Sequence, residues 1–130
     1  MSYLAHDTLE DLQHLARAPR ANILIVGDMA VSERDEVLRT VRRQRDLDVF
    51  YAQRPSEFAL PERGDVILVL DDVCELSRFD QNRLLGWMGQ NQGPIVSFAS
   101  RSLYGLVCEG RFVERLYYRL NMFCMLLTGD

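Results

Sequence analysis

Three residue pairs that contain polar side chains stand at the ends of apolar runs, and their types and spacing could support chemistry. They are Gly27-Asp28, Asp71-Asp72 and Ser100-Arg101. If the runs are parallel strands, the pairs lie at the carboxyl ends of those strands, where open parallel sheets carry their functional groups. Two adjacent acids could hold Mg²⁺, which prefers oxygen ligands and usually takes few protein carboxylates besides phosphate and water. The simpler interpretation is that these acids are polar residues at the point where a buried strand meets solvent.

The elements that must position these pairs follow from the hydrophobic pattern. The predicted strands cover 23–26, 48–52, 65–71, 95–99 and 122–127, and the predicted helices cover 1–19, 32–45, 77–91, 103–108 and 112–120. The runs at 23–26 and 65–71 contain continuous apolar stretches, which is typical of parallel strands covered on both faces. The alternation of strand and helix predicts a three-layer α/β domain with a mainly parallel sheet of about five strands.

Two predictions concern burial. Ser77 can cap the helix over 77–91, whose inner side is predicted to carry Phe79, Leu84, Leu85 and Met88, with Trp87 as a further core residue. The cysteines Cys74, Cys108 and Cys124 are far apart and form no CxxC pair, so neither a disulfide framework nor a zinc site is indicated. We expect small buried cysteines, most clearly Cys124, which lies in an apolar strand.

Composition narrows the class of protein. A chain of 130 residues, 48% hydrophobic and 26% charged, fits one globular domain over residues 1–130. With 15 basic and 19 acidic residues, the formal net charge is -4, which gives no electrostatic reason to bind nucleic acid, so we expect protein or small-molecule partners. Residues 1–20 lack the apolar run of a signal peptide, and no stretch approaches the roughly 20 apolar residues of a membrane span. These features predict a cytoplasmic protein without a membrane segment.

A response-regulator receiver domain shares part of this pattern. Asp28 would be the acid after the first strand, Asp71 the phosphoacceptor after the third, and Ser100 the hydroxyl after the fourth. A receiver usually has two acids together after its first strand and a Lys after its fifth. This chain has Gly27-Asp28 at the first place and no Lys at any position, because all 15 basic residues are Arg. The receiver interpretation therefore fits only in part.

The second half of the chain carries a more specific resemblance. Residues 109–121, EGRFVERLYYRLN, resemble the EGRFREDLYYRLN signature of bacterial sigma-54 activators, whose domain is a hexameric AAA+ ATPase. Residues 70–76, LDDVCEL, resemble that family's LDEIGEL Walker B region, and residues 81–85, QNRLL, resemble its following QAKLL. The resemblance covers about residues 20–127. It implies a P-loop/AAA+-like core over 20–127 after the N-terminal helix 1–19, and the chain is expected to lack the family's helical lid.

The phosphate-binding loop departs from the family pattern. Residues 27–34, GDMAVSER, align with the family's GESGTGKE, in which glycines and a Lys cradle phosphates. The alignment keeps Gly27 but puts Glu33 where the Lys belongs, and a carboxylate facing a triphosphate reverses the required sign of charge. Ala30 and Ser32 replace glycines that allow close backbone approach. Neither ATP nor Mg²⁺ is expected to bind in the family's manner.

The other catalytic positions that the resemblance implies are also altered. Asp71 keeps the magnesium-associated position, whereas Asp72 replaces the Glu that polarises the attacking water and Ser100 replaces the sensor Asn. Of two arginine fingers, the first position holds Val113 and only the second, Arg119, is kept. Fingers stabilise charge on the transferred phosphate, so the loss of one removes a strong transition-state interaction. The resemblance therefore predicts a pseudo-ATPase with vestigial sites.

The functional prediction is a non-catalytic regulatory protein-binding module, acting in transcriptional or signalling control through self- or hetero-association. Nothing resembles the GAFTGA loop by which activators engage the sigma factor, so that contact is not expected in the usual way. The partner is expected to be the chain itself, as a possible homo-oligomer, or a related activator. The alternatives are a receiver-like phosphoswitch on Asp71 and a nucleotide sensor that binds without hydrolysis. Arg119 could be a relic, an ion-pair partner of Glu109 or Glu114, or a finger offered to an intact ATPase.

Overall fold

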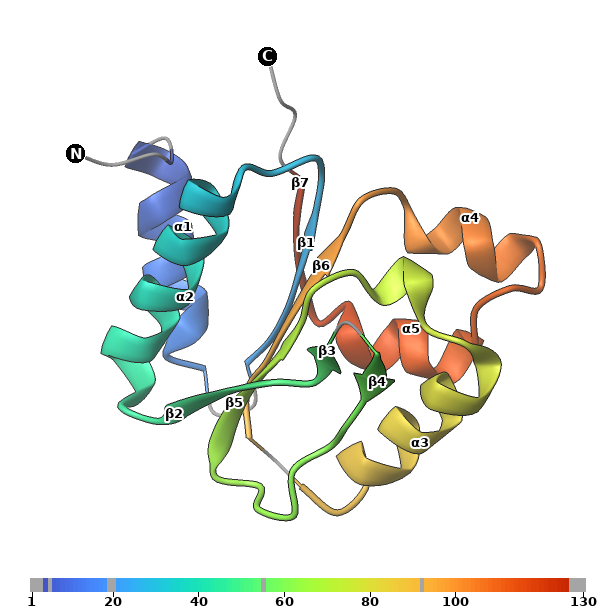
Figure 1. Cartoon of the computed structure of the whole chain (residues 1–130). Coiled ribbons are helices and arrows are strands. Elements are labelled where there is room, and N and C mark those ends of the chain that lie inside the picture. The colour runs from blue at the N-terminus through green and yellow to red at the C-terminus, as the bar shows by residue number, and fades with distance from the viewer. Residues whose placement is uncertain (1–3, 5, 19–20, 55, 92, 127–130) are drawn as a thin grey trace.

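The computed structural model describes residue 4 and residues 6–18, 21–54, 56–91 and 93–126, which form a parallel sheet with helices on both faces (Figure 1). The helices are α1 (His6–Ala16), α2 (Val31–Arg45), the 3-10 turn η1 (Val73–Glu75), α3 (Arg78–Met88), α4 (Leu103–Cys108) and α5 (Glu114–Leu120). The strands are β1 (Asn22–Val26), β2 (Asp48–Tyr51), β3 (Gln53–Arg54), β4 (Glu57–Phe58), β5 (Val66–Leu70), β6 (Ile95–Ala99) and β7 (Phe123–Leu126). Residues 1–3, 5, 19 and 127 of the predicted elements lie outside the described residues.

The main sheet has the order β2-β5-β6-β1-β7, and each neighbouring pair of strands is parallel. The predicted parallel sheet of five strands is therefore confirmed. Its order places β1 between β6 and β7 and separates β1 from β5 by one strand. The carboxyl ends of β1, β6 and β5 lie next to one another at the same edge of the sheet, as expected for parallel strands.

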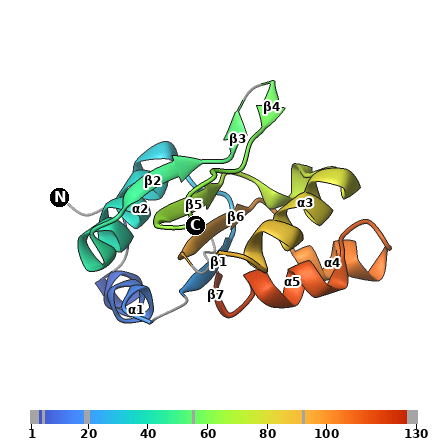
Figure 2. The same ribbon diagram turned by 90° about the horizontal axis from the view of Figure 1, so that it is seen from below.

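Two helical layers cover the sheet, with α1 and α2 on one face and α3, α4 and α5 on the other (Figure 2). Alternate residues of a strand point to opposite faces. In β1, Ile23 and Ile25 pack in the core beneath α1 and α2, whereas Leu24 packs in the core beneath the other three helices. β5 and β6 are buried along their whole length, which explains why β5 is continuously apolar and why Ser97 is the one polar residue of β6, and which confirms the three-layer architecture.

The predicted cap of α3 is confirmed, but one residue of its predicted inner side is not. The Ser77 hydroxyl accepts a hydrogen bond from the backbone N–H of Asp80 at 3.1 Å. Phe79 is 72% exposed, so its predicted burial is wrong. The buried residues of α3 are Gln81, Leu84 and Met88, three or four apart, and this stripe leaves position 79 on the solvent side of the first turn.

The cysteine prediction is also wrong in part. Cys108 and Cys124 are exposed and Cys74 is half-buried, and all three are free thiols. Cys124 belongs to β7, which forms an edge of the sheet, and its register partner in β1 is Leu24. Its side chain therefore shares a face with Leu24, but Leu24 is buried in a central strand whereas Cys124 is exposed at the edge. An apolar strand sequence did not reveal that the strand lies at an edge.

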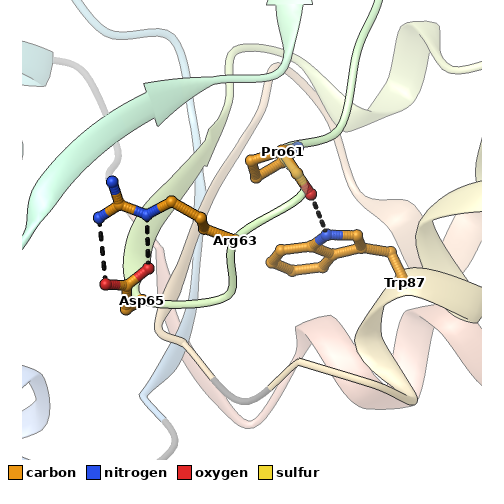
Figure 3. A network of polar contacts seen from close by, with 4 residues as sticks. All are labelled: Pro61, Arg63, Asp65 and Trp87. Carbon is orange, nitrogen blue, oxygen red and sulfur yellow. Dashed lines mark hydrogen bonds and ion pairs between the residues drawn. The ribbon is translucent and has the colours of Figure 1, made fainter.

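The segment between β4 and β5 is attached to α3 by Trp87. Its indole N–H donates to the carbonyl oxygen of Pro61 at 2.8 Å, and the half-buried ring packs against the core (Figure 3). In the same segment, Arg63 forms two hydrogen bonds with the carboxylate of Asp65, at 2.9 and 3.0 Å (Figure 3). This ion pair is largely exposed, so it contributes little to stability. Among the described residues, no helix is long and apolar enough to cross a membrane.

Candidate functional site

The loop after β1 begins with a glycine that the backbone requires. Gly27 has φ 146°, a conformation that side-chain-bearing residues rarely adopt, and its N–H donates to the carbonyl oxygen of Ala99 at 2.9 Å. The loop is thereby fixed to the end of β6 before it enters α2 at Val31. The sequence resemblance predicts that this loop holds the phosphate-binding position, and the structure places it at the carboxyl ends of the strands.

The amino terminus of α2 is capped by the side chain of Glu33. Ala30 occupies the N-cap position and has no side-chain acceptor, and its N–H donates to Oε1 of Glu33 at 3.0 Å. The negative charge also lies beside the positive end of the helix dipole, where a carboxylate is stabilised. A helix N-terminus at this place is a common anion site, because its free N–H groups point outward. Here the chain's own carboxylate takes one of those donors.

Arg34, the next residue of α2, reaches across to the end of β5. Its Nη1 donates to the carbonyl oxygen of Asp71 at 3.0 Å, and its guanidinium carbon lies 4.9 Å from the centroid of the Phe98 ring. A guanidinium at this distance from an aromatic face gains a cation–π interaction. Partial burial raises the pKa of the Asp71 carboxyl group, and the positive charge of Arg34 partly opposes that rise.

Asp72 is engaged by donors from three segments. Its Oδ2 accepts the hydroxyl of Ser100 at 2.9 Å, and its Oδ1 accepts the backbone N–H of Cys74 at 3.1 Å. The backbone N–H and C=O of Asp72 form two hydrogen bonds with the side-chain amide of Gln53, each at 2.9 Å. Asp72 therefore caps η1 and links the ends of β5 and β6 to β3. Its carboxylate serves the fold at the position where the family alignment expects a Glu that polarises water.

Cys74 lies beside this network and is also engaged. Its thiol donates to the carbonyl oxygen of Arg101 at 3.5 Å. Burial raises the pKa of the Cys74 thiol, and the negative charge of Asp72 adds to that rise. A thiol with a raised pKa is a weak nucleophile at neutral pH. Among the described residues, no group of three or more His, Cys, Asp and Glu side chains could hold a metal ion.

The predicted site residues divide into two places. Gly27, Glu33, Asp71, Asp72 and Ser100 lie together at the carboxyl edge of the sheet, joined through the contacts of Arg34 and Asp72. Arg119 lies in the last turn of α5, at the end of the sheet where β1 begins. Its carbonyl oxygen accepts a hydrogen bond from Nδ2 of Asn22, the first residue of β1, at 3.0 Å.

Arg119 is exposed at a hollow of about 370 Å³. The other lining residues are Asn22, Met88, Asn91, Gly93, Ile95, Tyr118 and Met122. Glu109, one of the two expected ion-pair partners, pairs instead with Arg111 at 3.8 Å. Within the described part of the chain, the guanidinium of Arg119 has no ion-pair partner, so the predicted pairing with Glu109 or Glu114 does not form.

Sequence reasoning missed Arg34 and Gln53. The sequence held one signal for Arg34. It directly follows Glu33, which occupies the family's Lys position, and it could supply a positive charge there because the chain has no Lys. Gln53 had none, because its role depends on the short β3–β4 hairpin, which the strand pattern did not predict. Val113 lies at the N-cap of α5 and donates its backbone N–H to Oε1 of the buried Gln81 at 2.8 Å, so this position has a structural contact.

Comparison with known proteins agrees with this architecture. The family model described as the sigma-54 interaction domain matches residues 7–129. Crystal structures of NtrX from Brucella abortus in complex with ATP and with ADP superpose with TM-scores of 0.76 and 0.75, each at 22% identity. They cover 99% and 95% of this chain, but the chain spans only 38% and 36% of the NtrX chains. At this identity the likeness shows the fold alone. No curated protein sequence matches the chain.

Proposed function

The chain belongs to the sigma-54 interaction domain family, and from that premise we propose that it is a non-catalytic regulatory module that binds protein partners instead of hydrolysing ATP. It would act in transcriptional or signalling control by associating with itself or with a related activator. The observation that carries this proposal is the contact between the Glu33 carboxylate and the Ala30 N–H, at the start of the helix that would receive phosphates.

The electrostatics of that contact argue against a bound triphosphate. Phosphate-binding loops of this class combine free backbone N–H groups with a Lys that contacts the β- and γ-phosphates. Here one donor is taken by a carboxylate, and the same carboxylate occupies the Lys position of the alignment. A nucleotide would have to displace Glu33 and then lie beside its negative charge. The residues present therefore do not fit ATP with Mg²⁺.

Asp72 supports the same conclusion about catalysis. A water-polarising carboxylate needs a free oxygen directed at the water, and a misplacement of about 1 Å can cost a hundredfold in rate. Both oxygens of Asp72 accept internal hydrogen bonds, from Ser100 and Cys74. Its side chain is also one methylene shorter than that of the Glu expected there. We infer that Asp72 holds strand ends together and takes no part in hydrolysis.

The surface supports a binding role. Large apolar side chains are exposed on α5, at the turn after it and on β7, and they are Tyr118, Met122 and Leu126. Exposed apolar groups that gather in one region mark interaction surfaces more often than scattered ones do. Arg119, whose guanidinium has no ion-pair partner within the described residues, lines one hollow with Tyr118 and Met122. This region offers both an apolar surface and a free cation to a partner.

Sedimentation velocity tests the proposal. The chain is measured alone over a range of concentrations, and again after mixing with a purified ATPase domain of a sigma-54 activator. We expect a self-associated species or a stoichiometric complex, and a phosphate-release assay on the chain alone is expected to equal the buffer blank. A chain that stays monomeric alone and binds no activator domain would contradict the proposal, as would measurable hydrolysis of ATP.

A second candidate function, a nucleotide sensor without hydrolysis, is favoured by Arg34. Its guanidinium is a cation at the carboxyl edge of the sheet, next to the Glu33 position. If a nucleotide binds there, Arg34→Gln should abolish binding, whereas Arg39→Gln, at an exposed position in the middle of the same helix, should not. Binding that is unaffected by Arg34→Gln would remove this candidate.

The phosphoswitch on Asp71 has no observation in its favour. In the receiver strand order 2-1-3-4-5, the first and third strands are neighbours, so their carboxyl-terminal acids share one site. Here β6 lies between β1 and β5, and the hydroxyl of Ser100 bonds to Asp72, not to Asp71. The strand order is therefore that of a different fold.

A further inference from the structure

β7 is an edge strand whose outer side is open. Among the described residues it pairs only with β1, so the N–H and C=O groups on its other side have no strand partner (Figure 1). Its sequence, Phe123-Cys124-Met125-Leu126, contains no charged residue and no Pro. Natural edge strands usually carry such residues, or a bulge, because an unprotected apolar edge pairs readily with another strand.

The opposite edge of the same sheet shows the usual protection. β2 carries Asp48, which lies 4.0 Å from Arg42 of α2, and the ring of its Phe50 is 5.5 Å from the guanidinium of Arg54. The chain then continues into the β3–β4 hairpin, which projects beyond the sheet (Figure 2). The two edges therefore differ in chemistry, and only β7 presents an uncharged apolar strand.

The side chains of β7 divide between the two faces of the sheet. Phe123 and Met125 are half-buried in the core beneath α1 and α2. Cys124 and Leu126 point to the other face, where Leu126 is 72% exposed. Met122, directly before the strand, is 49% exposed. The open backbone edge is thus bordered on one face by an exposed apolar strip of residues 122, 124 and 126.

Charged groups at the two ends of β7 are complementary. Arg119 lies at the amino-terminal end, and Asp28 is exposed in the loop after β1, at the carboxyl-terminal end. Neither side chain has an ion-pair partner within the described residues. An antiparallel strand placed along the edge reverses direction, so it would bring the Asp28 end of one copy to the Arg119 end of the other. Such complementarity fixes register and orientation.

We propose that the open edge of β7 binds β7 of a second copy of this chain, antiparallel about a twofold axis, so that one sheet continues across the dimer. This inference rests on the self-association in the proposed function and names its surface. A twofold interface is self-complementary, because each surface meets its own copy. Directly opposite residues of antiparallel strands point to the same face, so even-numbered residues meet even-numbered ones. A centre at Cys124 places the two Cys124 residues together and Met122 opposite Leu126 of the second copy.

The first test is sedimentation equilibrium of the full chain and of Leu126→Lys. In the proposed register the substitution buries a positive charge opposite Met122 of the second copy, at the end where that copy carries Arg119, and we expect it to raise the dimer dissociation constant at least about tenfold. Because Leu126 is 72% exposed in one copy, the monomer fold should be kept. Phe79→Lys, at an equally exposed apolar residue on α3, is the matched control and should leave the dimer unchanged. If the dimer forms equally well with Leu126→Lys, the proposed pairing of β7 edges is wrong, although self-association itself is retained.

The second test uses crosslinking of Cys124 to measure whether the two β7 strands lie side by side. In a Cys74→Ser, Cys108→Ser background, Cys124 is the single cysteine, and a short bis-maleimide should link two copies covalently. A Cys74→Ser, Cys124→Ser chain keeps only the exposed Cys108 of α4 and should stay uncrosslinked. A dimer that crosslinks equally through Cys108 would overturn the proposed edge. A chain that is monomeric yet binds an activator domain would overturn this inference and leave the proposed function standing.

Discussion

At the scale of single residues, the candidate site is filled by its own side chains. Glu33 accepts the Ala30 N–H, Arg34 contacts the Asp71 carbonyl oxygen, and Asp72 accepts Ser100 and Cys74. Each contact stabilises the fold. Glu33 caps α2, Arg34 ties α2 to the end of β5, and Asp72 links the ends of β5 and β6. The sequence resemblance assigns Glu33, Asp71 and Asp72 to positions that serve phosphate, metal and water in a nucleotide-hydrolysing relative. In the proposed function, the contacts that stabilise the fold are also the contacts that oppose nucleotide binding.

Replacing Glu33 tests its structural role. Glu33→Ala removes the side-chain acceptor and the negative charge at the positive end of α2, so the free energy of unfolding should fall by roughly 0.3–1 kcal/mol. Urea denaturation followed by circular dichroism measures this loss. Glu62→Ala, at an exposed position in the segment before β5, is the control and should change stability less. Equal effects of the two substitutions would show that the cap contributes nothing specific.

Asp71 makes a prediction about pH. Because burial raises the pKa of its carboxyl group in the folded state, its contribution to stability is fully present below the ordinary Asp pKa and is lost as pH rises through the raised value. Asp71→Asn removes this penalty, so the substitution should raise the melting temperature at pH 7. The gain should disappear as pH falls below the ordinary Asp range, where the wild-type carboxyl group is protonated. A substitution that lowers the melting temperature at pH 7 would mean that the Arg34 charge outweighs the burial.

At the scale of elements, the predicted strands were more accurate than the predicted side-chain directions. The buried runs at β5 and β6 could be predicted closely, because strands covered on both faces are almost entirely apolar. Phe79 could not be placed, because a short helix with mixed polarity allows more than one inner stripe. Cys124 could not be placed either, because an edge strand and a central strand share the same apolar composition. The β3–β4 hairpin has only two residues per strand, too few to show a pattern.

The cap of α3 gives a prediction at this scale. Ser77→Ala removes the acceptor of the Asp80 N–H and should lower the free energy of unfolding by about 1 kcal/mol. Ser102 occupies the same N-cap position in α4 but makes no side-chain cap bond, so Ser102→Ala is a matched control. Urea denaturation of the two variants should show a loss for Ser77→Ala and almost none for Ser102→Ala. A similar loss for both would contradict the assignment of the cap.

At the scale of the whole molecule, the sheet brings the predicted site residues of three strands together at the carboxyl ends of those strands. It leaves Arg119 at the opposite end of the sheet, beside the first residue of β1. That grouping could be predicted from the rule that parallel strands present their carboxyl ends together. The internal contacts that fill the site could not, because they depend on Arg34 and Gln53, whose partners are distant in sequence. The molecule therefore combines the family fold, a group of predicted site residues that hydrogen-bond to one another, and exposed apolar side chains on α5 and β7.

The most direct measurement is isothermal titration calorimetry of the full chain with ATP and with ADP, each with Mg²⁺, on a sample whose oligomeric state is determined by light scattering. The account predicts no heat of binding for either nucleotide, because Glu33 supplies negative charge at the helix terminus and occupies an N–H donor. It also predicts that the molar mass is unchanged by nucleotide. Micromolar binding of ATP or ADP would contradict the closed site and would favour a nucleotide sensor, with Arg34→Gln as the next variant to titrate.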